Sequence, residues 1–426
     1  MDFFEEIKWR GLIHNSTPGI KKRLSQGSVP GYIGFDPTAA SLQVGNLSVI
    51  MLLVHFQRFG HLPIALIGGA TGMIGDPSGK SEERVLLSIE EIQHNQECFK
   101  KQLCNFLQFD KVPNPAEIVN NIEWFSDVTF LTFLRDVGKH LTVNYMLAKD
   151  SVQQRLESGL SFTEFSYQLL QGYDFFWLNK NKKCIVQMGG SDQWGNIITG
   201  IELIRRKSGN ETHAITCPLL TKSDGSKFGK SAAGEKIWLD PTMTSPYKFY
   251  QFWLNCTDDE AKRYIRIFSL LSREEIDGLE QEMAKNPDIR PIQKVLAKEI
   301  TTRVHSKSEC KNAVDASEIL FGKGTTDMLK KISERNFLEI FDGIPKYKIT
   351  KQVLEMNIDV ISILTDHTKI FSSKGEARRM IQNNGLAINK MKINNQKVII
   401  TSDYLLNGKY ILVQKGKKNY SIIEII

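Results

Sequence analysis

The stretch Gly31-Tyr32-Ile33-Gly34-Phe35-Asp36-Pro37-Thr38 predicts a short buried strand followed by a polar turn. Residues 45–59 come next and are apolar nearly all round, which predicts a buried helix. Two more core strands are predicted over 63–67 and 184–188, and a pair of glycines follows each of them. Short apolar strands that end in glycine and alternate with helices are typical of a parallel, doubly wound sheet. Ligands of such sheets bind beyond the carboxyl ends of the strands.

The remainder of the chain divides by its pattern. From about residue 241 it is helical and polar, and a glycine- and lysine-rich stretch from 321 to about 351 is typical of a linker. The tail predicts a helix over 373–381 and strands over 386–388, 397–400 and 409–413. We therefore expect an α/β, Rossmann-like domain (1–230), an α-helical domain (231–330), a linker (331–354) and a small α+β module (355–426).

Composition bounds the class of protein. The chain has 426 residues, of which 41% are hydrophobic and 24% are charged, as in ordinary globular proteins. No apolar run is long enough to span a bilayer, and the acidic start lacks the order of a signal peptide, so we expect a cytoplasmic protein. The six cysteines and eight histidines show no metal-ligand spacing, which predicts no protein-bound metal.

The positive charge is concentrated at one end of the chain. Residues 321–426 carry 18 Lys and Arg against 10 Asp and Glu, whereas the rest carries 37 against 38. The net charge of +7 therefore lies in the last quarter of the chain, which favours a polyanionic partner such as RNA over a merely solvated surface.

Two segments are candidates for phosphate binding. Residues 75–81 superficially resemble a P-loop but have three residues between their glycines instead of four, so we reject that interpretation. The turn after residue 35 leads to a helix start, where free N–H groups favour an anion. Gly45 would let a nucleotide approach the backbone closely. Gln43 and Asn46 flank it and can donate amide hydrogens, or can simply cap the helix.

A lysine-bearing loop completes the pattern. Lys227-Phe228-Gly229-Lys230-Ser231 follows Ser223-Asp224-Gly225-Ser226, which predicts a mobile loop whose two ammonium groups can close on phosphates. Together with the segment 43–46 and with Gly189-Gly190-Ser191-Asp192-Gln193, it resembles the signature of class I aminoacyl-tRNA synthetases, specifically the bacterial-type tyrosyl family. Gln43 and Asn46 stand where the His-Ile-Gly-His motif has histidines, and the lysine segment matches Lys-Met-Ser-Lys-Ser.

This resemblance covers nearly the whole chain and implies roles for individual residues. It implies that catalysis depends on Thr38, Gln43, Lys227, Lys230 and Ser231. It implies that ATP, brought with Mg²⁺ and without a tightly bound cofactor, contacts Gly34, Asp36, Gly45, Asn46, Gly190, Asp192 and Lys230.

A polar stripe on one predicted helix suits the amino-acid substrate. Tyr167, Gln171 and Asp174 have i, i+4, i+7 spacing and so share one helix face. Such a stripe is also found in ordinary buried polar networks. The resemblance implies that Tyr167, Gln171 and Asp76 hold the ammonium of L-tyrosine, that Asp174 and Tyr32 contact its phenolic hydroxyl, and that Gln187 and Gln193 lie near its carboxylate.

The basic tail resembles a small RNA-binding module of the ribosomal-protein S4 type. Its predicted helix carries Lys374, Arg378 and Arg379, which would meet RNA phosphates. The resemblance also implies tRNA(Tyr) as partner, anticodon binding by the helical domain and a homodimer, with the apolar stretch 130–147 as candidate interface helix. Neither a membrane nor DNA is implied as a partner.

Two other functions remain open. A tryptophan–tRNA ligase would share the fold and reaction, but an indole has no hydroxyl for Asp174 and Tyr32. A catalytically inactive, synthetase-derived RNA-binding factor is favoured by the altered Gln43 and Asn46 and opposed by the intact lysine segment.

Overall fold

The computed structural model describes residues 2–78, 86–156, 159–231, 234–321, 326–342, 344–416 and 419–426. The end of the P-loop-like segment (79–81) and residues 322–325 of the expected linker lie outside this description. The chain forms two compact units, one comprising Met1–Thr244 and Phe252–His305, the other Ser245–Gln251 and Ser306–Ile426.

The first unit is built on a six-stranded sheet with the order β1-β6-β5-β2-β3-β4. All neighbouring strands are parallel except β1, which runs antiparallel to β6. The predicted doubly wound parallel sheet is thus confirmed. From β2 the chain moves outward to β3 and β4, then returns to the other side of β2 with β5 and β6, so a topological switch point lies between β2 and β5. The strands are β1 (Asn15–Ser16), β2 (Pro30–Phe35), β3 (Leu62–Ile67), β4 (Glu117–Asn120), β5 (Val186–Gly190) and β6 (His213–Cys217).

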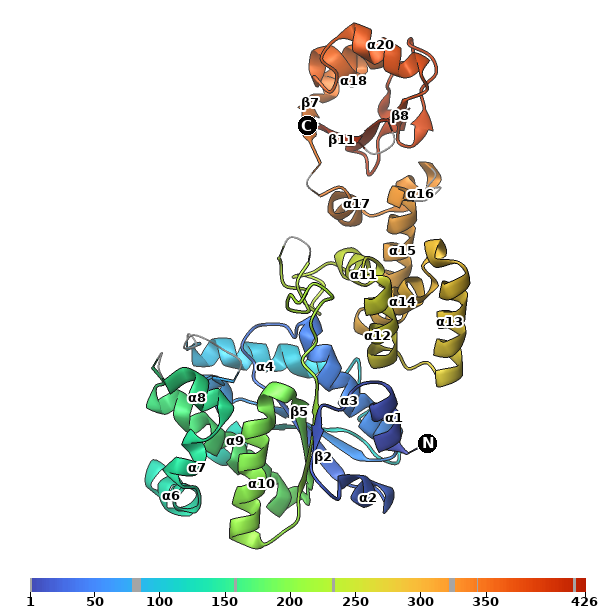
Figure 1. Ribbon diagram of the computed structural model, residues 1–426. Helices are drawn as coiled ribbons and strands as arrows, with labels where there is room; N and C mark the ends of the chain where they lie inside the picture. The colour runs from blue at the N-terminus through green and yellow to red at the C-terminus, as the bar shows by residue number, and fades with distance from the viewer. Residues whose placement is uncertain are drawn as a thin grey trace. The chain divides into compact units, whose positions relative to one another are not determined.

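Helices cover this sheet (Figure 1). The predicted apolar helix is α3 (Leu47–Arg58), which is buried along most of its length. Its approach to β2 is close, since a Cβ on Gly31 would lie 2.7 Å from the ring of Phe56. Helix α11 (Pro246–Leu254) has residues in both units. The other helices of four or more residues in this unit are α1 (Phe3–Trp9), α2 (Ile20–Ser25), α4 (Ile89–Leu103), α5 (Ile122–Phe125), α6 (Phe130–Asp136), α7 (Val143–Leu147), α8 (Asp150–Leu156), α9 (Phe162–Lys182), α10 (Trp194–Ser208), α12 (Asp258–Phe268), α13 (Arg273–Lys285) and α14 (Pro291–Val304).

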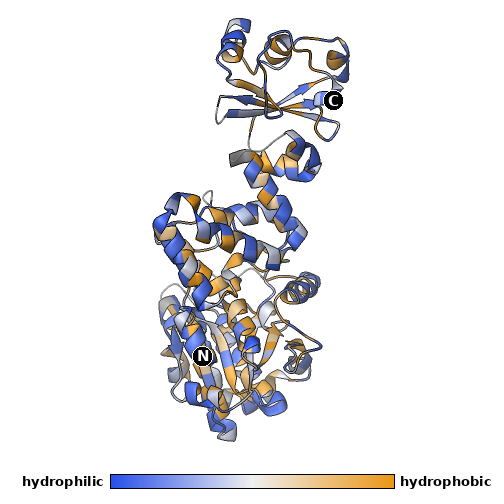
Figure 2. Cartoon of the chain, turned by 90° about the vertical axis from the view of Figure 1, so that its right-hand side faces the viewer, coloured by the Kyte–Doolittle hydropathy of each residue, from blue (hydrophilic) through white to orange (hydrophobic). Residues whose placement is uncertain are grey.

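Figure 2 shows hydrophobic residues gathered on the strands of the first unit, while the helices mix hydrophobic and hydrophilic residues. The sheet therefore lies in the hydrophobic interior of this unit. Among the described residues, no helix combines the length and the apolar character that crossing a membrane requires.

The stretch 130–147 does not form one helix, contrary to our expectation. It contains the short helices α6 and α7, separated by a 3₁₀ turn at Gly138–His140. The side chain of Thr142 caps α7 by accepting the N–H of Tyr145, so a new helix begins there. Phe130, Leu131 and Val143 are 63%, 77% and 60% exposed, respectively.

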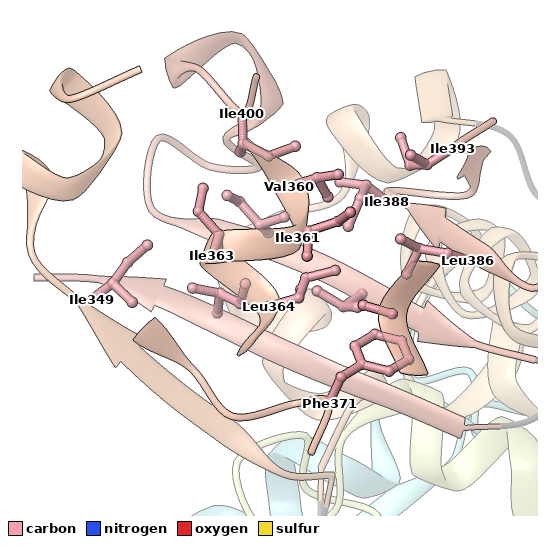
Figure 3. Close-up of a cluster of buried hydrophobic side chains, with 14 of the residues drawn as sticks. Ile349, Val360, Ile361, Ile363, Leu364, Phe371, Leu386, Ile388, Ile393 and Ile400 are labelled. Carbon is pink, nitrogen blue, oxygen red and sulfur yellow. The ribbon is translucent and has the colours of Figure 1, made fainter. Parts of the chain in front are cut away.

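The second unit contains a five-stranded sheet with the order β7-β11-β10-β8-β9. Its strands are β7 (Lys346–Ile349), β8 (Leu386–Ile388), β9 (Met391–Lys392), β10 (Tyr410–Lys415) and β11 (Asn419–Ile425). Its helices are α15 (Lys307–Phe321), α16 (Thr326–Lys331), α17 (Glu334–Ile340), α18 (Lys351–Glu355), α19 (Val360–Ser362) and α20 (Lys374–Gln382), with a π-helical turn at Ile363–His367. Figure 3 shows the apolar side chains, among them Ile361, Leu364 and Phe371, that pack over this sheet.

Two predictions for this unit were wrong. Residues 397–400 form no strand; Ile399 makes a single bridge with Asp359, because the side chain of Asn395 turns the chain by accepting the N–H of Lys397. The expected linker 331–354 is folded: it contains α17, α18 and β7, and β7 pairs in parallel with β11. Its lysines misled the prediction, because they point outward from an edge strand whose Ile349 is buried.

Asn389 is the polar centre of the second unit and yields a stability prediction. It is 1% exposed, has a φ of 49°, accepts the N–H of Leu412 and donates to the carbonyl of Tyr404. Asn389→Ala leaves both backbone groups unpaired, so we expect a loss of about 2–4 kcal/mol in stability and faster amide exchange over β10. Hydrogen-exchange mass spectrometry and thermal unfolding measure this.

Asn407→Ala is the matched control. Asn407 has a φ of 51° and an exposed side chain, so its substitution carries the backbone strain of alanine in this conformation without the buried hydrogen bonds. Equal losses in the two variants would contradict the role assigned to Asn389.

Candidate active site

A continuous chain of hydrogen bonds links β2 to α9 at the switch point. Asp36 follows β2 and accepts the hydroxyl hydrogens of Tyr167 (2.7 Å) and Thr71 (2.7 Å). The amide of Asn121 donates to Thr71 Oγ1 (3.0 Å) and to Asp174 Oδ2 (3.1 Å). Tyr167 and Asp174, both from the polar stripe of α9, are therefore tied to the same crevice from opposite ends of the network.

Asp174 lies in the most desolvated part of this network. Burial raises the pKa of its carboxyl well above the usual range, while hydrogen bonds from Asn121 and Trp124 oppose the shift. Trp124 Nε1 donates to Asp174 Oδ1 at 2.9 Å, and its ring stacks on Trp177 with centroids 4.2 Å apart. Each carboxylate oxygen of Asp174 thus accepts one fixed donor, which holds the group in one orientation.

Tyr32 lies on β2 beside this carboxylate. Burial, followed by the charge of Asp174, raises the pKa of the Tyr32 phenol well above 10. The side chain is 1% exposed, and its hydroxyl has no hydrogen-bond partner among the described residues. A buried hydroxyl without a partner is costly in a finished structure, and it fits a site that a polar ligand completes.

Two glutamines extend the same polar surface. Gln187 lies on β5 directly opposite Tyr32 in the sheet register, and Gln171 lies one turn before Asp174 on α9. The Oε1 atoms of both are buried without a partner among the described residues. The Gln171 oxygen is an acceptor, as the ammonium group of an amino acid requires.

Asp76 belongs to a second polar cluster, on the β5 side. Gln193 Nε2 donates to Asp76 Oδ2 at 2.6 Å and lies 3.3 Å from Asp192 Oδ2. Asn196 Nδ2 lies 3.4 Å from Asp76 Oδ1 and 3.3 Å from Ser78 Oγ. Hydrogen bonds therefore join the turn after β5 to Asp76. The sequence predicted that Asp76, Asp192 and Gln193 belong to one site, and this contact is consistent with that prediction.

Glycines leave backbone exposed at the end of β2 and in the first motif. Gly34 is exposed although it lies in an otherwise buried stretch of β2, and a Cβ on Gly45 would meet no atom within 4 Å. A Cβ on Gly190 would lie 2.5 Å from Asp192 Oδ1, so that position also requires glycine. Thr38, also exposed, follows Asp36 in the turn, and its N–H donates to the Asp36 carbonyl at 2.8 Å. Backbone surface at Gly34 and Gly45 is therefore open to a ligand.

The lysine segment lies against the first motif, although about 180 residues separate them in the sequence. The N–H of Val44 donates to the carbonyl of Ile237 (2.9 Å), and the N–H of Ile237 donates to the carbonyl of Gly229 (3.0 Å). Gly229 has a φ of 92°, and a Cβ there would lie 3.5 Å from the backbone nitrogen of Gly45. The exposed side chains of Lys227 and Lys230 flank this contact.

The two amides of the first motif form one cap. Gln43 is the N-cap of the short 3₁₀ turn Val44–Asn46, and Asn46 Oδ1 accepts the N–H of Gln43 at 2.9 Å, so the capping alternative holds at this turn. Ser231 stabilises the end of the lysine loop, since its N–H donates to the carbonyl of Glu235 (2.7 Å) and its Oγ accepts the Glu235 N–H (3.1 Å).

The predicted RNA contacts lie in the second unit. Lys374, Arg378 and Arg379 are exposed on α20, and Lys374 Nζ lies 2.8 Å from Asp366. In the described ranges no group of three or more Asp, Glu, His or Cys could hold a metal ion.

The chain is similar to known proteins along nearly its whole length. A family model described as "tRNA synthetases class I (W and Y)" matches residues 25–322, and one described as "Tyrosine--tRNA ligase SYY-like C-terminal domain" matches residues 336–423. A tyrosine–tRNA ligase from Cytophaga hutchinsonii is 57% identical over 99% of both chains, and one from Bacteroides fragilis is 55% identical over 99% of both. The chain belongs to the tyrosine–tRNA ligase family.

Solved structures agree with this assignment. A C-terminally truncated mitochondrial tyrosyl-tRNA synthetase from Aspergillus nidulans superposes with a TM-score of 0.69 at 31% identity and covers 75% of this chain and 94% of its own. A counterpart from Coccidioides posadasii gives a TM-score of 0.64 at 28% identity, covering 74% of this chain and 91% of its own. The catalytic fold of the tyrosine–tRNA ligases is thus reproduced here.

Four residues that hydrogen-bond to the predicted site residues were not predicted from the sequence. They are Thr71, Asn121, Trp124 and Asn196. One signal was available: Asn120 and Asn121 come directly after the apolar segment of β4. Two amides at a strand end of a doubly wound sheet favour a ligand crevice. The partners of these residues depend on long-range strand order.

Asn121 yields the prediction for this site. Asn121→Ala removes the donor shared by Thr71 and Asp174 and the acceptor of the Ala70 N–H (2.7 Å). The freed Asp174 carboxylate loses its fixed orientation, so we expect the Kd for L-tyrosine to rise at least about tenfold, the effect of one lost hydrogen bond to a charged group. Isothermal titration calorimetry measures it.

Asn312→Ala, on the exposed surface of α15, serves as control and should bind tyrosine like the unaltered chain. An unchanged tyrosine affinity in Asn121→Ala would contradict the organising role of this amide.

Proposed function

We propose that the chain is an active tyrosine–tRNA ligase that makes tyrosyl-adenylate from L-tyrosine and ATP and then transfers tyrosine to the 3′ end of tRNA(Tyr). The observation that carries this proposal is the buried pair Tyr32 and Asp174, together with the exposed backbone of Gly34 and Gly45 and the lysine segment that lies against Gly45. The pair supplies a donor and an acceptor for one hydroxyl, and the glycines supply open backbone for a nucleotide.

In the first step the tyrosine carboxylate attacks the α-phosphorus of ATP. A bond forms between a carboxylate oxygen and phosphorus, and the bond to the bridging oxygen of pyrophosphate breaks. The carboxylate is already ionised at neutral pH, so no general base is needed and positioning carries the reaction. We assign Gln43, Lys227 and Lys230 to the leaving pyrophosphate, with Thr38 at the turn after β2.

The other predicted site residues are assigned to the remaining ligand groups. Gln171, Tyr167 and Asp76 would hold the substrate ammonium, while Gln187 and Gln193 lie on the carboxylate side. Asp192 would accept a ribose hydroxyl, as carboxylates in nucleotide sites commonly do. Gly34, Asp36, Gly45, Asn46 and Gly190 line the rest of the ATP path, with Ser231 stabilising the loop.

In the second step a terminal ribose hydroxyl of tRNA attacks the tyrosyl carbonyl. An ester bond forms, the mixed-anhydride bond breaks and AMP leaves with the electron pair. The basic second unit supports this step by holding tRNA through phosphate contacts of Lys374, Arg378 and Arg379.

We further propose that the enzyme works in the cytoplasm as a homodimer. The exposed apolar side chains of Phe130, Leu131 and Val143 support the dimer, because exposed apolar patches commonly mark protein interfaces. Mg²⁺ would enter with ATP and would offset the negative charge of its phosphates.

Substrate choice tests the proposal directly. Phenylalanine leaves the Tyr32 hydroxyl without a partner and gives the Asp174 carboxylate no donor beyond Asn121 and Trp124, and tryptophan offers neither group a hydroxyl. We expect tyrosine to support ATP–pyrophosphate exchange at more than about a hundred times the rate with either competitor, since a buried hydroxyl would go unpaired and a hydrogen bond to a buried carboxylate would be lost.

The three amino acids are compared side by side at equal concentration. Faster exchange with tryptophan would replace the proposal by a tryptophan–tRNA ligase. No exchange with any of them, together with tight binding of structured RNA, would establish the inactive RNA-binding factor.

The glutamine of the first motif gives a graded prediction. Gln43→His introduces a donor that can carry positive charge near the leaving pyrophosphate, so adenylate formation should accelerate several-fold while tyrosine affinity stays constant. Gln43→Leu removes the donor and should slow the same step. Stopped-flow adenylate formation measures both variants, and a large loss of tyrosine binding in Gln43→His would show that Gln43 faces tyrosine instead of phosphate.

A further inference from the structure

The lysine segment begins in a small hairpin whose shape is set by its own backbone. Thr221 and Lys227 form an antiparallel bridge, and the N–H of Lys222 donates to the carbonyl of Ser226 at 2.9 Å. Gly225 has a φ of 79°, and Asp224 accepts the N–H of Ser226 at 2.9 Å. This hairpin places Lys227 at its end, so any contact that holds the hairpin also fixes Lys227.

Helix α12 holds this hairpin at its N-terminal end. Glu260 Oε1 accepts the N–H of Ser223 at 2.9 Å, while its Oε2 accepts the N–H of Thr257 at 2.9 Å. Ser223 Oγ lies 3.2 Å from Thr257 Oγ1, and the guanidinium of Arg263 donates to the carbonyl of Thr221. Three side chains of one helix end therefore contact two residues of the hairpin.

The carboxylate of Glu260 is suited to this contact. It is 7% exposed, and burial alone would raise its pKa, but the N–H groups of Ser223 and Thr257 outweigh burial and lower the pKa below the usual range. Glu260 is therefore ionised at neutral pH, and its hydrogen bonds are of the stronger, charge-assisted kind.

An aromatic cluster continues the attachment. Phe228 directly follows Lys227. It packs on Tyr264 and Phe268 of α12, with ring centroids 5.0 and 5.7 Å apart, respectively. It also contacts Phe252 and Trp253 of α11 at 5.7 and 5.9 Å. The lysine segment is thus anchored to α12 on both sides of Lys227.

The opposite end of α12 is fixed to the catalytic core by arginines. Arg10 of α1 donates to the carbonyls of Arg266, Ser269 and Leu271, at 2.7, 2.9 and 2.6 Å. Arg303 of α14 donates to the carbonyl of Phe268 at 2.7 Å. Guanidinium groups satisfy the free carbonyls of a helix end and complement its dipole, so α12 is held rigidly.

We propose that Glu260 is a positioning residue for adenylate formation: with Arg263 it clamps the 221–227 hairpin to α12 and so sets where Lys227 and Lys230 meet the leaving pyrophosphate. This inference deepens the proposed function and rests on it.

The simpler interpretation is that Glu260 only caps α12. Thr257 and Glu260 do form a capping box, and Ser272 and Glu275 form the same box at the start of α13. Glu275 is exposed and its carboxylate accepts only the N–H of Ser272 among the described contacts. Glu275→Ala therefore removes an equivalent cap without touching the hairpin, which makes it the matched control.

The test measures ATP–pyrophosphate exchange with tyrosine in the full chain. Glu260→Ala should lower kcat about tenfold, the effect of losing one charge-assisted hydrogen bond, while KM for tyrosine changes less than about twofold. Glu260→Gln keeps one acceptor oxygen and should fall between. Glu275→Ala should match the unaltered chain.

A second readout does not depend on activity. Hydrogen exchange over residues 221–227 should accelerate at least about tenfold in Glu260→Ala and in Arg263→Ala, and remain unchanged in Glu275→Ala and in Lys262→Ala, an exposed neighbour. Arg263→Ala keeps the capping box and so serves where Glu260→Ala folds poorly.

The outcomes separate the two proposals. An unchanged kcat, a rise in KM for tyrosine alone, or an equal loss in Glu275→Ala would overturn the positioning role. If the unaltered chain shows no exchange with tyrosine, the proposed function fails, and hydrogen exchange alone then decides whether the clamp exists; unchanged protection of 221–227 in Glu260→Ala would overturn it.

Discussion

Two carboxylates, the half-buried Asp36 and the buried Asp174, share one hydrogen-bonded network, and the site depends on keeping both in place. The charge of Asp36 raises the pKa of Asp174 further, so the pair repel each other in a medium that screens poorly. The network holds because each carboxylate accepts fixed donors, from Tyr167 and Thr71 on one side and from Asn121 and Trp124 on the other. Removing one donor would leave a carboxylate with fewer hydrogen bonds. The effects of substitutions at these residues are therefore not expected to add independently.

Glycine at the strand ends is the complement of this network. A Cβ on Gly68 would lie 2.0 Å from Asp36 Oδ1, and one on Gly69 would lie 2.3 Å from Asn120 Oδ1. The carboxylate and the amide can approach the backbone of the β3 turn only because no side chain stands there. The glycine pairs that predicted strand ends in the sequence therefore have a second role, because they make room for the polar groups that orient the substrate pocket.

The sequence allowed prediction of what depends on local pattern. Strand β2, helix α3 and the stripe of Tyr167, Gln171 and Asp174 follow from periodicity, and the glycine turns follow from strand ends. The features that could not be predicted from the sequence depend on contacts between distant segments. Asn121 reaches Asp174 only because β4 lies beside β3, and β7 is a strand only because β11 offers it an edge. Without that edge, the lysines of β7 have the composition of a linker.

The same distinction governs the two signature motifs. They were recognisable only together, and their meeting depends on residues 237–239, which carry no signature. Ile237 bridges Val44 and Gly229, and the N–H of Leu239 donates to the carbonyl of Leu42 at 2.9 Å. A backbone ladder of this kind fixes the distance between the motifs without specifying side chains. The contacts that join residue 43 to Lys227 and Lys230 are thus made by main chain, and they do not depend on which side chain stands at position 43.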